Sequence, residues 1–247
     1  MISFIDIGNT NIVISFLDNE KMYRIKTKKD ASADEYAFFL DQYFNNLEAV
    51  IISSVVPEIN NAFCEYFTSR FNINPTYITP GIKTGIKIKA DNPKEVGSDL
   101  ICDTVGAVST YSDTCLVIDL GTATKFIYIE NKSLKGVAIA PGMETGKKSL
   151  ISRTSLLLEM TLETPSSVLG SNTITAMKSG LVYGHSAMID GMIERIKEEV
   201  GNKYLKIIIT GGLAKLVEPL LKEKVIRDDY LIFRGLKSIY LLNNIQK

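Results

Sequence analysis

The chain has 247 residues, of which 45% are hydrophobic and 23% charged, as expected for a globular protein with one large domain or two of ordinary size. Lys plus Arg and Asp plus Glu both number 28, and this zero net charge argues against binding to nucleic acids or membrane surfaces. No apolar run approaches the length of a membrane helix, and no basic segment precedes the first apolar residues, so we expect a cytoplasmic protein.

Cysteine and histidine are too scarce to predict a zinc centre. The three cysteines, Cys64, Cys102 and Cys115, lack the spacing of metal ligands, and their odd number favours reduced thiols. The single histidine, His185, falls in a predicted helix, where a solvent-facing or hydrogen-bonded side chain is commoner than a catalytic one. A catalytic triad of Ser, His and Asp therefore has little support.

The first half of the chain predicts a sheet followed by helices. Two short apolar runs flank the polar residues 6–11, which is typical of a β-hairpin. Further strands are expected at residues 21–26, 50–54 and 76–78, and helices at residues 31–45, 57–70 and 100–111. The stretch 80–93 is rich in Pro, Gly and Lys and predicts an irregular loop with an edge strand.

The second half repeats this order. Strands are expected at residues 115–119, 125–130, 134–140, 205–210 and 230–233, and helices at residues 143–159, 173–200, 213–222 and 238–243. Strands followed by helices in both halves indicate an α/β protein with mixed sheets. We expect two domains, residues 1–112 and residues 113–247.

The segment DIGNTN, from Asp6 to Asn11, has the residues of a phosphate-binding turn. Gly8 allows the backbone to approach a ligand closely, and Asn9, Thr10 and Asn11 supply hydrogen-bond donors for anionic oxygens. Asp6 ends the first strand and is a candidate ligand for a hydrated Mg²⁺ that would hold a phosphate. An ordinary hairpin turn is the alternative, because Asn and Gly are common turn residues.

A second copy of this pattern, DLGTATKFIY, begins at Asp119, about half a chain length after DIGNTNIVIS at Asp6. Both copies follow an apolar strand and continue as acid, aliphatic residue, Gly and small polar residues. Internal similarity of this kind is an architectural signal. It predicts two copies of one sheet domain, each presenting a phosphate-facing turn to a shared cleft, and chance resemblance of two turns is the alternative.

Three further segments carry candidate site residues. Gly97-Ser98-Asp99 stands at a predicted helix start, where Asp99 is either a general base for a substrate hydroxyl or part of a helix cap. Asp103, one turn later, is the second candidate base. Gly211-Gly212 follows a buried strand and either admits a flat ligand such as adenine or forms a plain turn. Residues 140–142, Ala-Pro-Gly, predict a turn.

Together these segments resemble the type III pantothenate kinase family of the actin-like ATPase superfamily, which also includes acetate and sugar kinases. The family motifs occur in order along nearly the whole chain, and in combination they are specific although each is weak alone. They are D-x-G-N-T at residues 6–10, N-P-x-x-V-G-x-D at 92–99, D-x-G-T-A-T at 119–124, I-x-P-G at 139–142, G-x-N-T at 170–173 and T-G-G at 210–212.

The resemblance implies two ribonuclease-H-like domains, a homodimer, and ATP-dependent phosphorylation of pantothenate, the first step towards coenzyme A. It implies that Asp99 is the catalytic base, that Mg²⁺ accompanies ATP, and that Asp119 binds a monovalent cation, K⁺ or NH₄⁺. The implied ATP-binding residues are Asp6, Ile7, Gly8, Asn9, Thr10, Asn11, Ile12, Val13 and Thr122. The implied substrate-binding residues are Gly97, Ser98, Asp99, Leu100 and Thr173. Phosphoryl transfer depends mostly on positioning and charge neutralisation, which this set of residues supplies.

Some positions depart from the family pattern. Leu100 replaces an Arg that follows the catalytic Asp, Ala90 replaces a Tyr of the pantothenate pocket, and Lys125 ends the D-x-G-T-A-T-T run. The nucleotide motifs are thus retained while acceptor motifs have changed, and an apolar residue cannot bind a carboxylate as Arg does. Lys87 and Lys89 are the candidates to hold the acceptor instead.

Three functional hypotheses follow: a pantothenate kinase, a catalytically weakened relative that acts as a nucleotide-binding regulatory protein, and an actin-like kinase for another small hydroxylated acceptor. Ala90 and Leu100 favour the second and third. Asp99 favours the first and third, because a protein that only binds has no need of a base. The helices predicted at 100–111 and 173–200 are the candidate dimer surfaces.

Overall fold

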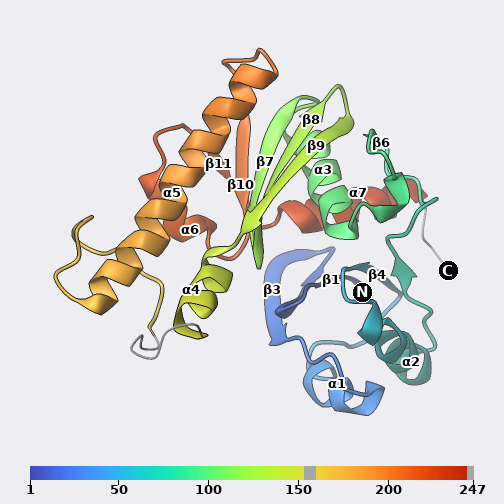
Figure 1. Ribbon diagram of the computed structural model, residues 1–247. Helices are drawn as coiled ribbons and strands as arrows, with labels where there is room; N and C mark the ends of the chain where they lie inside the picture. The colour runs from blue at the N-terminus through green and yellow to red at the C-terminus, as the bar shows by residue number, and fades with distance from the viewer. Residues whose placement is uncertain (153–159, 244–247) are drawn as a thin grey trace. The chain divides into compact units, whose positions relative to one another are not determined.

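The computed structural model describes residues 1–152 and 160–243 (Figure 1). The chain forms two compact units. The first comprises Met1–Asp113, Glu130–Lys135 and Tyr230–Lys247, and the second comprises Thr114–Ile129 and Gly136–Asp229. Residues 153–159, the end of one predicted helix, lie outside the described part of the chain.

A five-stranded mixed sheet forms the centre of the first unit. Its strand order is β3 (Asn19–Lys26), β2 (Asn11–Phe16), β1 (Ile2–Ile7), β4 (Ala49–Ser54) and β5 (Thr76–Tyr77). β1 is antiparallel to β2 and parallel to β4, which confirms the predicted hairpin and the strand that follows the first helix. The hairpin forms because two apolar runs flank a turn of small polar residues.

Helices pack on both faces of this sheet. Ile5 and Ile7 belong to a core shared with α1 (Ala33–Leu40) and with α2 (Asn60–Phe71), which the 3₁₀ turn η1 (Pro57–Ile59) precedes. Phe4 belongs to a second core, shared with α3 (Ser98–Thr110) and α7 (Leu231–Asn243). Because side chains alternate along a strand, Asp6 lies on the same face of β1 as Phe4, the face that α3 covers.

Helix α1 is shorter than the helix predicted at residues 31–45. It begins at a capping box in which Ser32 and Glu35 bond each other's backbone, and it ends at Leu40. The irregular stretch predicted at 80–93 contains the short strand β6 (Lys87–Ile88), which pairs in parallel with Ser133 and Leu134 of the same unit. The 3₁₀ turn η2 (Pro93–Glu95) leads from there to α3.

Helix α7 shows that the strand predicted at residues 230–233 is wrong. The segment belongs to one α-helix, and each of its buried residues has another one three or four positions away: Leu231, Phe233, Gly235, Leu236, Ile239 and Tyr240. α7 packs closely on α3, since a Cβ at Gly106 would collide with the backbone of Leu231, and a Cβ at Gly235 with that of Cys102. Most apolar residues of α3 are therefore buried within the first unit.

The second unit repeats the strand arrangement of the first unit. The order is β11 (Ile226–Arg227), β10 (Ile207–Thr210), β7 (Cys115–Leu120), β8 (Ala123–Glu130) and β9 (Ser133–Pro141), whose first residues belong to the first unit. β7 is antiparallel to β8 and parallel to β10, as β1 is to β2 and β4. The second strand–turn–strand pattern read from the sequence is thus a second hairpin.

Four helical segments accompany these strands: α4 (Met143–Ser152), α5 (Thr173–Glu199), α6 (Ala214–Val217) and the 3₁₀ turn η3 (Glu218–Leu220). α5, the long orange helix of Figure 1, is continuous through its three glycines and starts at a capping box of Asn172 and Thr175. Its Ile189 and Ile193 pack with Leu116 and Ile118 of β7. The helix predicted at 213–222 is shorter than expected, because Pro219 has no N–H to continue it.

Two mixed sheets flanked by helices confirm the predicted α/β class. Among the described residues, no helix is both long and apolar enough to span a bilayer.

Candidate active site

The first predicted phosphate turn joins β1 to β2 and is held by its own backbone and by β3. Gly8 donates its N–H to the carbonyl of Asn11 at 3.0 Å, which closes the turn. Thr27, just after β3, donates its hydroxyl to the carbonyl of Gly8 at 2.6 Å, and its N–H to the carbonyl of Thr10 at 3.1 Å. Thr27 therefore stabilises the turn, although no local sequence signal indicates this role.

The side chains of this turn divide by exposure. Ile7 and Ile12 are fully buried in the core, so only their backbone can face a ligand. Asn9 is exposed, and Thr10 and Asn11 are partly exposed, as hydrogen-bond donors for a phosphate need to be. Asp6 stands opposite Val13 on β2 and Ser53 on β4, at the end of β1.

Hydrogen bonds of serine hydroxyl groups connect the start of α3 to the end of β4. The Oγ atoms of Ser98 and Ser53 lie 3.1 Å apart, and Ser98 also donates to the carbonyl of Ser54 at 3.0 Å. Both Ser98 and Ser53 are buried. Ser98, which was predicted to contact the substrate, thus positions the helix that carries Asp99.

Asp99 is not the N-cap of α3. Gly97 occupies the cap position, and no side chain caps the helix from there. The backbone N–H of Leu100 donates to Asp99 Oδ1 at 2.8 Å. A Cβ at Gly97 would lie 2.5 Å from the same oxygen, so the glycine leaves room for this carboxylate orientation. Asp99 is partly exposed, whereas Asp103, the other candidate base, is buried.

The buried thiol of Cys102 interacts electrostatically with three acids of the first unit. Burial raises the pKa of the Cys102 thiol well above its usual value, and the negative charges of Asp103, Asp6 and Asp99 raise it further. Asp6 lies on the face of β1 that α3 covers, and Asp99 lies in the first turn of α3. The structure thereby brings together the acid of the phosphate turn and the predicted base.

The second predicted turn, between β7 and β8, is clamped by the start of α4. Gly142 donates its N–H to the carbonyl of Thr122 at 3.1 Å, and Thr145 donates its hydroxyl to the same carbonyl at 2.6 Å. A Cβ at Gly142 would collide with the carbonyl oxygens of Gly121 and Thr122. The glycine of I-x-P-G is therefore a close-contact residue, and Thr122 itself is exposed at the tip of the turn.

Asp119 forms an ion pair within the second hairpin. Its Oδ2 lies 2.6 Å from Nζ of Lys125, the residue directly opposite on β8. Gly211, at the end of β10, has a φ of +95°, and a Cβ there would lie 2.7 Å from Asp119 Oδ1 and 2.6 Å from the carbonyl oxygen of Leu120. Gly211 thus allows a tight turn close to β7. The neighbouring Gly212 is exposed.

Thr173 is exposed at the first turn of α5 and lines a hollow of about 670 Å³. The lining residues come from the G-x-N-T segment, from α4 and from α5: Leu150, Gly170, Ser171, Asn172, Thr173, Ala176, Met177, Gly180 and Leu181. A second hollow, of about 830 Å³, lies along the other end of α5 and contains none of the predicted site residues.

His185 is a hydrogen-bonded residue of the second unit. Its Nε2 lies 2.8 Å from Oγ1 of Thr124, on β8. Burial lowers the pKa of the His185 imidazole, which keeps the ring neutral at pH 7. The expectation of a satisfied histidine is confirmed.

Comparison with known proteins identifies the family. A profile described as type III pantothenate kinase matches residues 3–195. A type III pantothenate kinase of Dictyoglomus turgidum is 40% identical over 98% of this chain and 100% of its own length. The chain belongs to the type III pantothenate kinase family. A type III pantothenate kinase of Shouchella clausii is 41% identical over 97% of this chain and 98% of its own length.

A structural relative supports the fold. A solved structure from Sinorhizobium meliloti, described as a 2-dehydro-3-deoxygalactonokinase, matches with a TM-score of 0.65 at 11% identity, over 98% of this chain and 96% of that chain. At this identity the likeness concerns the fold alone.

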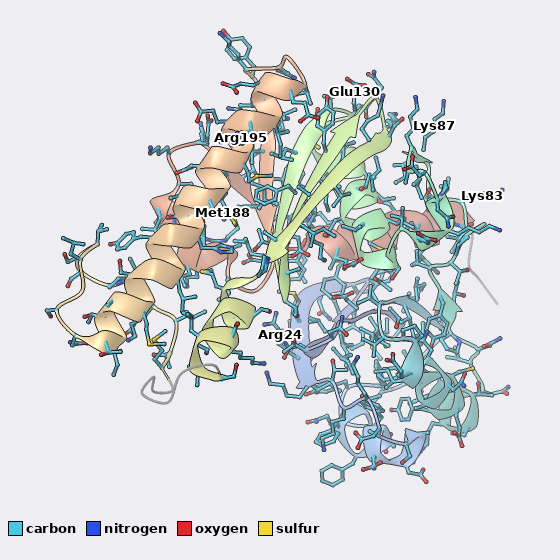
Figure 2. The ribbon with its side chains drawn as sticks, in the orientation of Figure 1. Arg24, Lys83, Lys87, Glu130, Met188 and Arg195 are labelled. Carbon is cyan, nitrogen blue, oxygen red and sulfur yellow. The ribbon has the colours of Figure 1, made fainter. Side chains whose placement is uncertain are left out.

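In this type III pantothenate kinase, the acceptor positions differ most from the pattern. Leu100 and Ala90 are both partly exposed in the first unit, on α3 and in the segment before it. Lys87 and Lys89, the candidate replacements for the missing Arg, are both exposed. Figure 2 labels Lys87 on β6, with Lys83 a little earlier in the same segment.

Proposed function

We propose that this chain transfers the γ-phosphoryl group of ATP to pantothenate, the first step of coenzyme A biosynthesis, in the cytoplasm and without any nucleic-acid partner. The observation that carries the proposal is the hydrogen bond between Ser98, beside Asp99, and Ser53, the strand partner of Asp6, in a member of the type III pantothenate kinase family. An acid beside a phosphate turn and a second acid at a helix start are the two charged groups that such a transfer uses.

Asp99 acts as the general base. As the pantothenate hydroxyl oxygen bonds to the γ-phosphorus, the bond from that phosphorus to the bridging oxygen breaks and ADP leaves. The hydroxyl proton passes to the Asp99 carboxylate. The N–H of Leu100 holds Oδ1 of this carboxylate at 2.8 Å, which supports a fixed orientation towards the acceptor.

The turn between β1 and β2 binds the phosphates of ATP. Its backbone from Asp6 to Val13 approaches the anion, and Asn9, Thr10 and Asn11 donate hydrogen bonds to it. Among the residues described, no three His, Cys, Asp or Glu side chains form a group suited to a metal ion. A Mg²⁺ ion bound with a nucleotide commonly uses one or two carboxylates, waters and the phosphates themselves. Asp6 would be the carboxylate, and the ion would supply neutralising charge.

The second unit contributes Thr122 and Thr173. Thr122 is exposed at the tip of a turn whose carbonyl is fixed by Gly142 and Thr145, which supports a contact of its side chain with ATP. Thr173 lies beside the capping residue Asn172 in a hollow of about 670 Å³, which supports a contact with pantothenate. The resemblance also implies a monovalent cation at Asp119, the acid that pairs with Lys125.

The acceptor carboxylate must be held without the usual Arg. Gly97, Ser98 and Leu100 surround Asp99, and Leu100 has no group that could bond a carboxylate. Lys87 and Lys89 are exposed cations of the first unit that can supply this charge. A kinase for another small hydroxylated acceptor is the second candidate function, and Leu100 is the observation that favours it.

The protein is a homodimer that uses α5 as its contact surface. Exposed or partly exposed small residues follow one stripe of this helix: Ala176, Gly180, Gly184, Ala187 and Gly191. Small residues allow a second helix to approach closely, and among the described residues a Cβ at Gly184 would have no neighbour within 4 Å. Gly184→Glu should therefore give a monomer by light scattering while Asn61→Glu, on the exposed surface of α2, stays a dimer. A dimeric Gly184→Glu variant contradicts this assignment.

Product analysis tests the function. Purified enzyme with Mg²⁺ and ATP should release ADP only when pantothenate is added, and mass spectrometry should find 4′-phosphopantothenate. Asp99→Asn should lower turnover by about 10² to 10⁴ while leaving ATP binding unchanged by calorimetry. Asp18→Asn, an exposed acid in the turn after β2, is the matched control and should keep full activity. No ADP release with pantothenate sinks the proposal, and release with another alcohol alone favours the second candidate.

A further inference from the structure

Among the described ion pairs of the second unit, Asp119–Lys125 is the pair whose two side chains together are least exposed. Nζ and Oδ2 are 2.6 Å apart, and the side chains of Lys125 and Asp119 are only 16% and 15% exposed. A charge that is mostly withdrawn from water is stable only beside its partner. The Lys125 ammonium is therefore a fixed component of the second turn, unlike the exposed lysines on the surface.

The remaining surroundings of the Asp119 carboxylate are close-packed. Oδ1 faces the backbone of Gly211, where a Cβ would lie 2.7 Å away. A Cβ at Gly121 would lie 3.8 Å from each of the two carboxylate oxygens. A K⁺ ion bound in a protein replaces its hydration shell with several oxygen atoms. This carboxylate offers an ammonium on one oxygen and packed backbone at the other, so the residues present do not fit a bound monovalent cation.

The register of the two hairpins explains why a lysine lies opposite Asp119. In the first hairpin, Ile7 pairs with Ile12, and Asp6 faces the uncharged Val13. In the second, Leu120 pairs with Thr124, and Asp119 faces Lys125. The second turn is one residue shorter, and a shift of one residue moves a side chain to the other face of the sheet. Counted from the acid, Lys125 corresponds to the buried Ile12, yet it points to the carboxylate.

We propose that the Lys125 ammonium takes the place of the monovalent cation that the resemblance implies at Asp119, so that this enzyme needs neither K⁺ nor NH₄⁺. The inference rests on the proposed kinase function. The ammonium carries the same single positive charge as K⁺, and its three N–H groups are directional donors. It neutralises Asp119 beside the second turn, where the phosphates of ATP are expected.

The Lys125 ammonium, which is covalently attached to the chain, also excludes a free cation from Asp119. The covalent link keeps the ammonium at a high effective concentration beside the carboxylate at every salt concentration. A K⁺ ion could bind Asp119 only by displacing the ammonium, which would leave a largely enclosed charge without its partner. Added K⁺ should therefore change neither nucleotide binding nor turnover.

Cation replacement in a kinase assay tests the proposal. The wild-type enzyme should have the same kcat/KM for ATP in KCl, NH₄Cl, NaCl and tetramethylammonium chloride. Lys125→Thr, which restores the family residue at this position, should lose about tenfold or more in tetramethylammonium and recover with K⁺ along a saturable curve. Lys125→Met, the uncharged side chain of similar length, is the matched control and should be slow in every salt. Saturable activation of the wild-type enzyme by K⁺ overturns the proposal, as does a Lys125→Thr variant that needs no cation.

A binding measurement separates this inference from the kinase function. Calorimetric titration of ADP and thermal unfolding, each in KCl and in tetramethylammonium chloride, should give equal values for the wild type in both salts. For Lys125→Thr, K⁺ should tighten ADP binding and raise the unfolding temperature. If pantothenate is not phosphorylated in any salt, the proposed function fails, and these two measurements still decide the cation question. If Lys125→Thr does not fold, the wild-type arms decide it alone.

Discussion

The hydroxyl oxygens of Ser98 and Ser53 lie 3.1 Å apart, and Ser53 is the residue of β4 that pairs with Asp6 of β1. This contact ties the helix that carries the proposed base to the strand beside the phosphate turn. Adjacent strands lie about 5 Å apart, so strand pairing and one side-chain hydrogen bond connect Asp6, through Ser53, to Ser98 beside Asp99. The separation of the two acids is thus set by the packing of α3 on the sheet.

Ser98→Ala should lower kcat much more than it changes KM for ATP, because it loosens the helix that positions Asp99 and leaves the turn that binds phosphate intact. It also leaves the buried Ser53 hydroxyl without this partner, which costs about 1–3 kcal/mol of unfolding free energy. Steady-state kinetics and urea unfolding measure the two effects. Ser109→Ala, at the exposed end of α3, removes a hydroxyl that bonds only within its own helix and should change neither value. Equal effects of the two variants would contradict the positioning role.

Gly97→Ala should reduce turnover with little loss of stability. The backbone at Gly97 has an ordinary φ of −58°, so alanine introduces no backbone strain. Its Cβ would lie 2.5 Å from Asp99 Oδ1, and the carboxylate must rotate away from the acceptor. We expect a fall in kcat of about tenfold, equal to about 1.4 kcal/mol of activation free energy. Gly136→Ala, on β9, meets no described neighbour within 4 Å and should retain full activity.

Gly142→Ala should destabilise the protein, unlike Gly146→Ala four residues later in the same segment. At Gly142 the added Cβ would collide with two backbone carbonyls of the second turn, which cannot rotate away as a side chain can. We expect a loss of more than about 2 kcal/mol of unfolding free energy, as is usual for overpacking against fixed backbone. At Gly146 the nearest atom is a methyl group of Leu181 at 3.3 Å, which can shift. Chemical denaturation of both variants measures the difference, and equal losses would count against the clamp on Thr122.

The stability of the protein should fall in mild acid because of His185. Burial lowers the pKa of this histidine below its unfolded value near 6.5, so the unfolded chain takes up the proton first as the pH falls. The contribution of His185 is fully present above pH 6.5 and is lost as the pH falls from there through the folded pKa. Denaturant unfolding at several pH values should show this loss for the wild type and a smaller one for His185→Gln. Identical pH profiles of the two proteins would remove His185 as the cause.

The sequence by itself predicted most of the local structure around the site. Both hairpins follow from apolar runs on either side of Gly-containing polar turns, and these signals act over neighbouring residues only. The start of α3 at Ser98 and the start of α5 at Thr173 also follow from local signals. The order of motifs was enough to indicate the family, which the comparisons confirm.

Local signals failed where long-range packing decided the outcome. The apolar segment from Tyr230 was predicted as a strand, but it begins α7, whose Gly235 packs against Cys102 of α3. A short apolar run suits a strand or a helix equally, and only the partner that buries it selects one. Thr27, which braces the first turn, lies far from it in sequence and carries no local signal of that role.

For the two acids that end β1 and β7, the sequence determined their position in matching turns, because turn chemistry is local. Only the tertiary structure decided what each acid faces. Asp6 lies on the face of β1 that α3 covers, and α3 carries Asp99 in its first turn. Asp119 faces Lys125 because the second turn is one residue shorter and its register differs. Side chains alternate between the two faces of a strand, so a single residue of register decides which group meets a carboxylate.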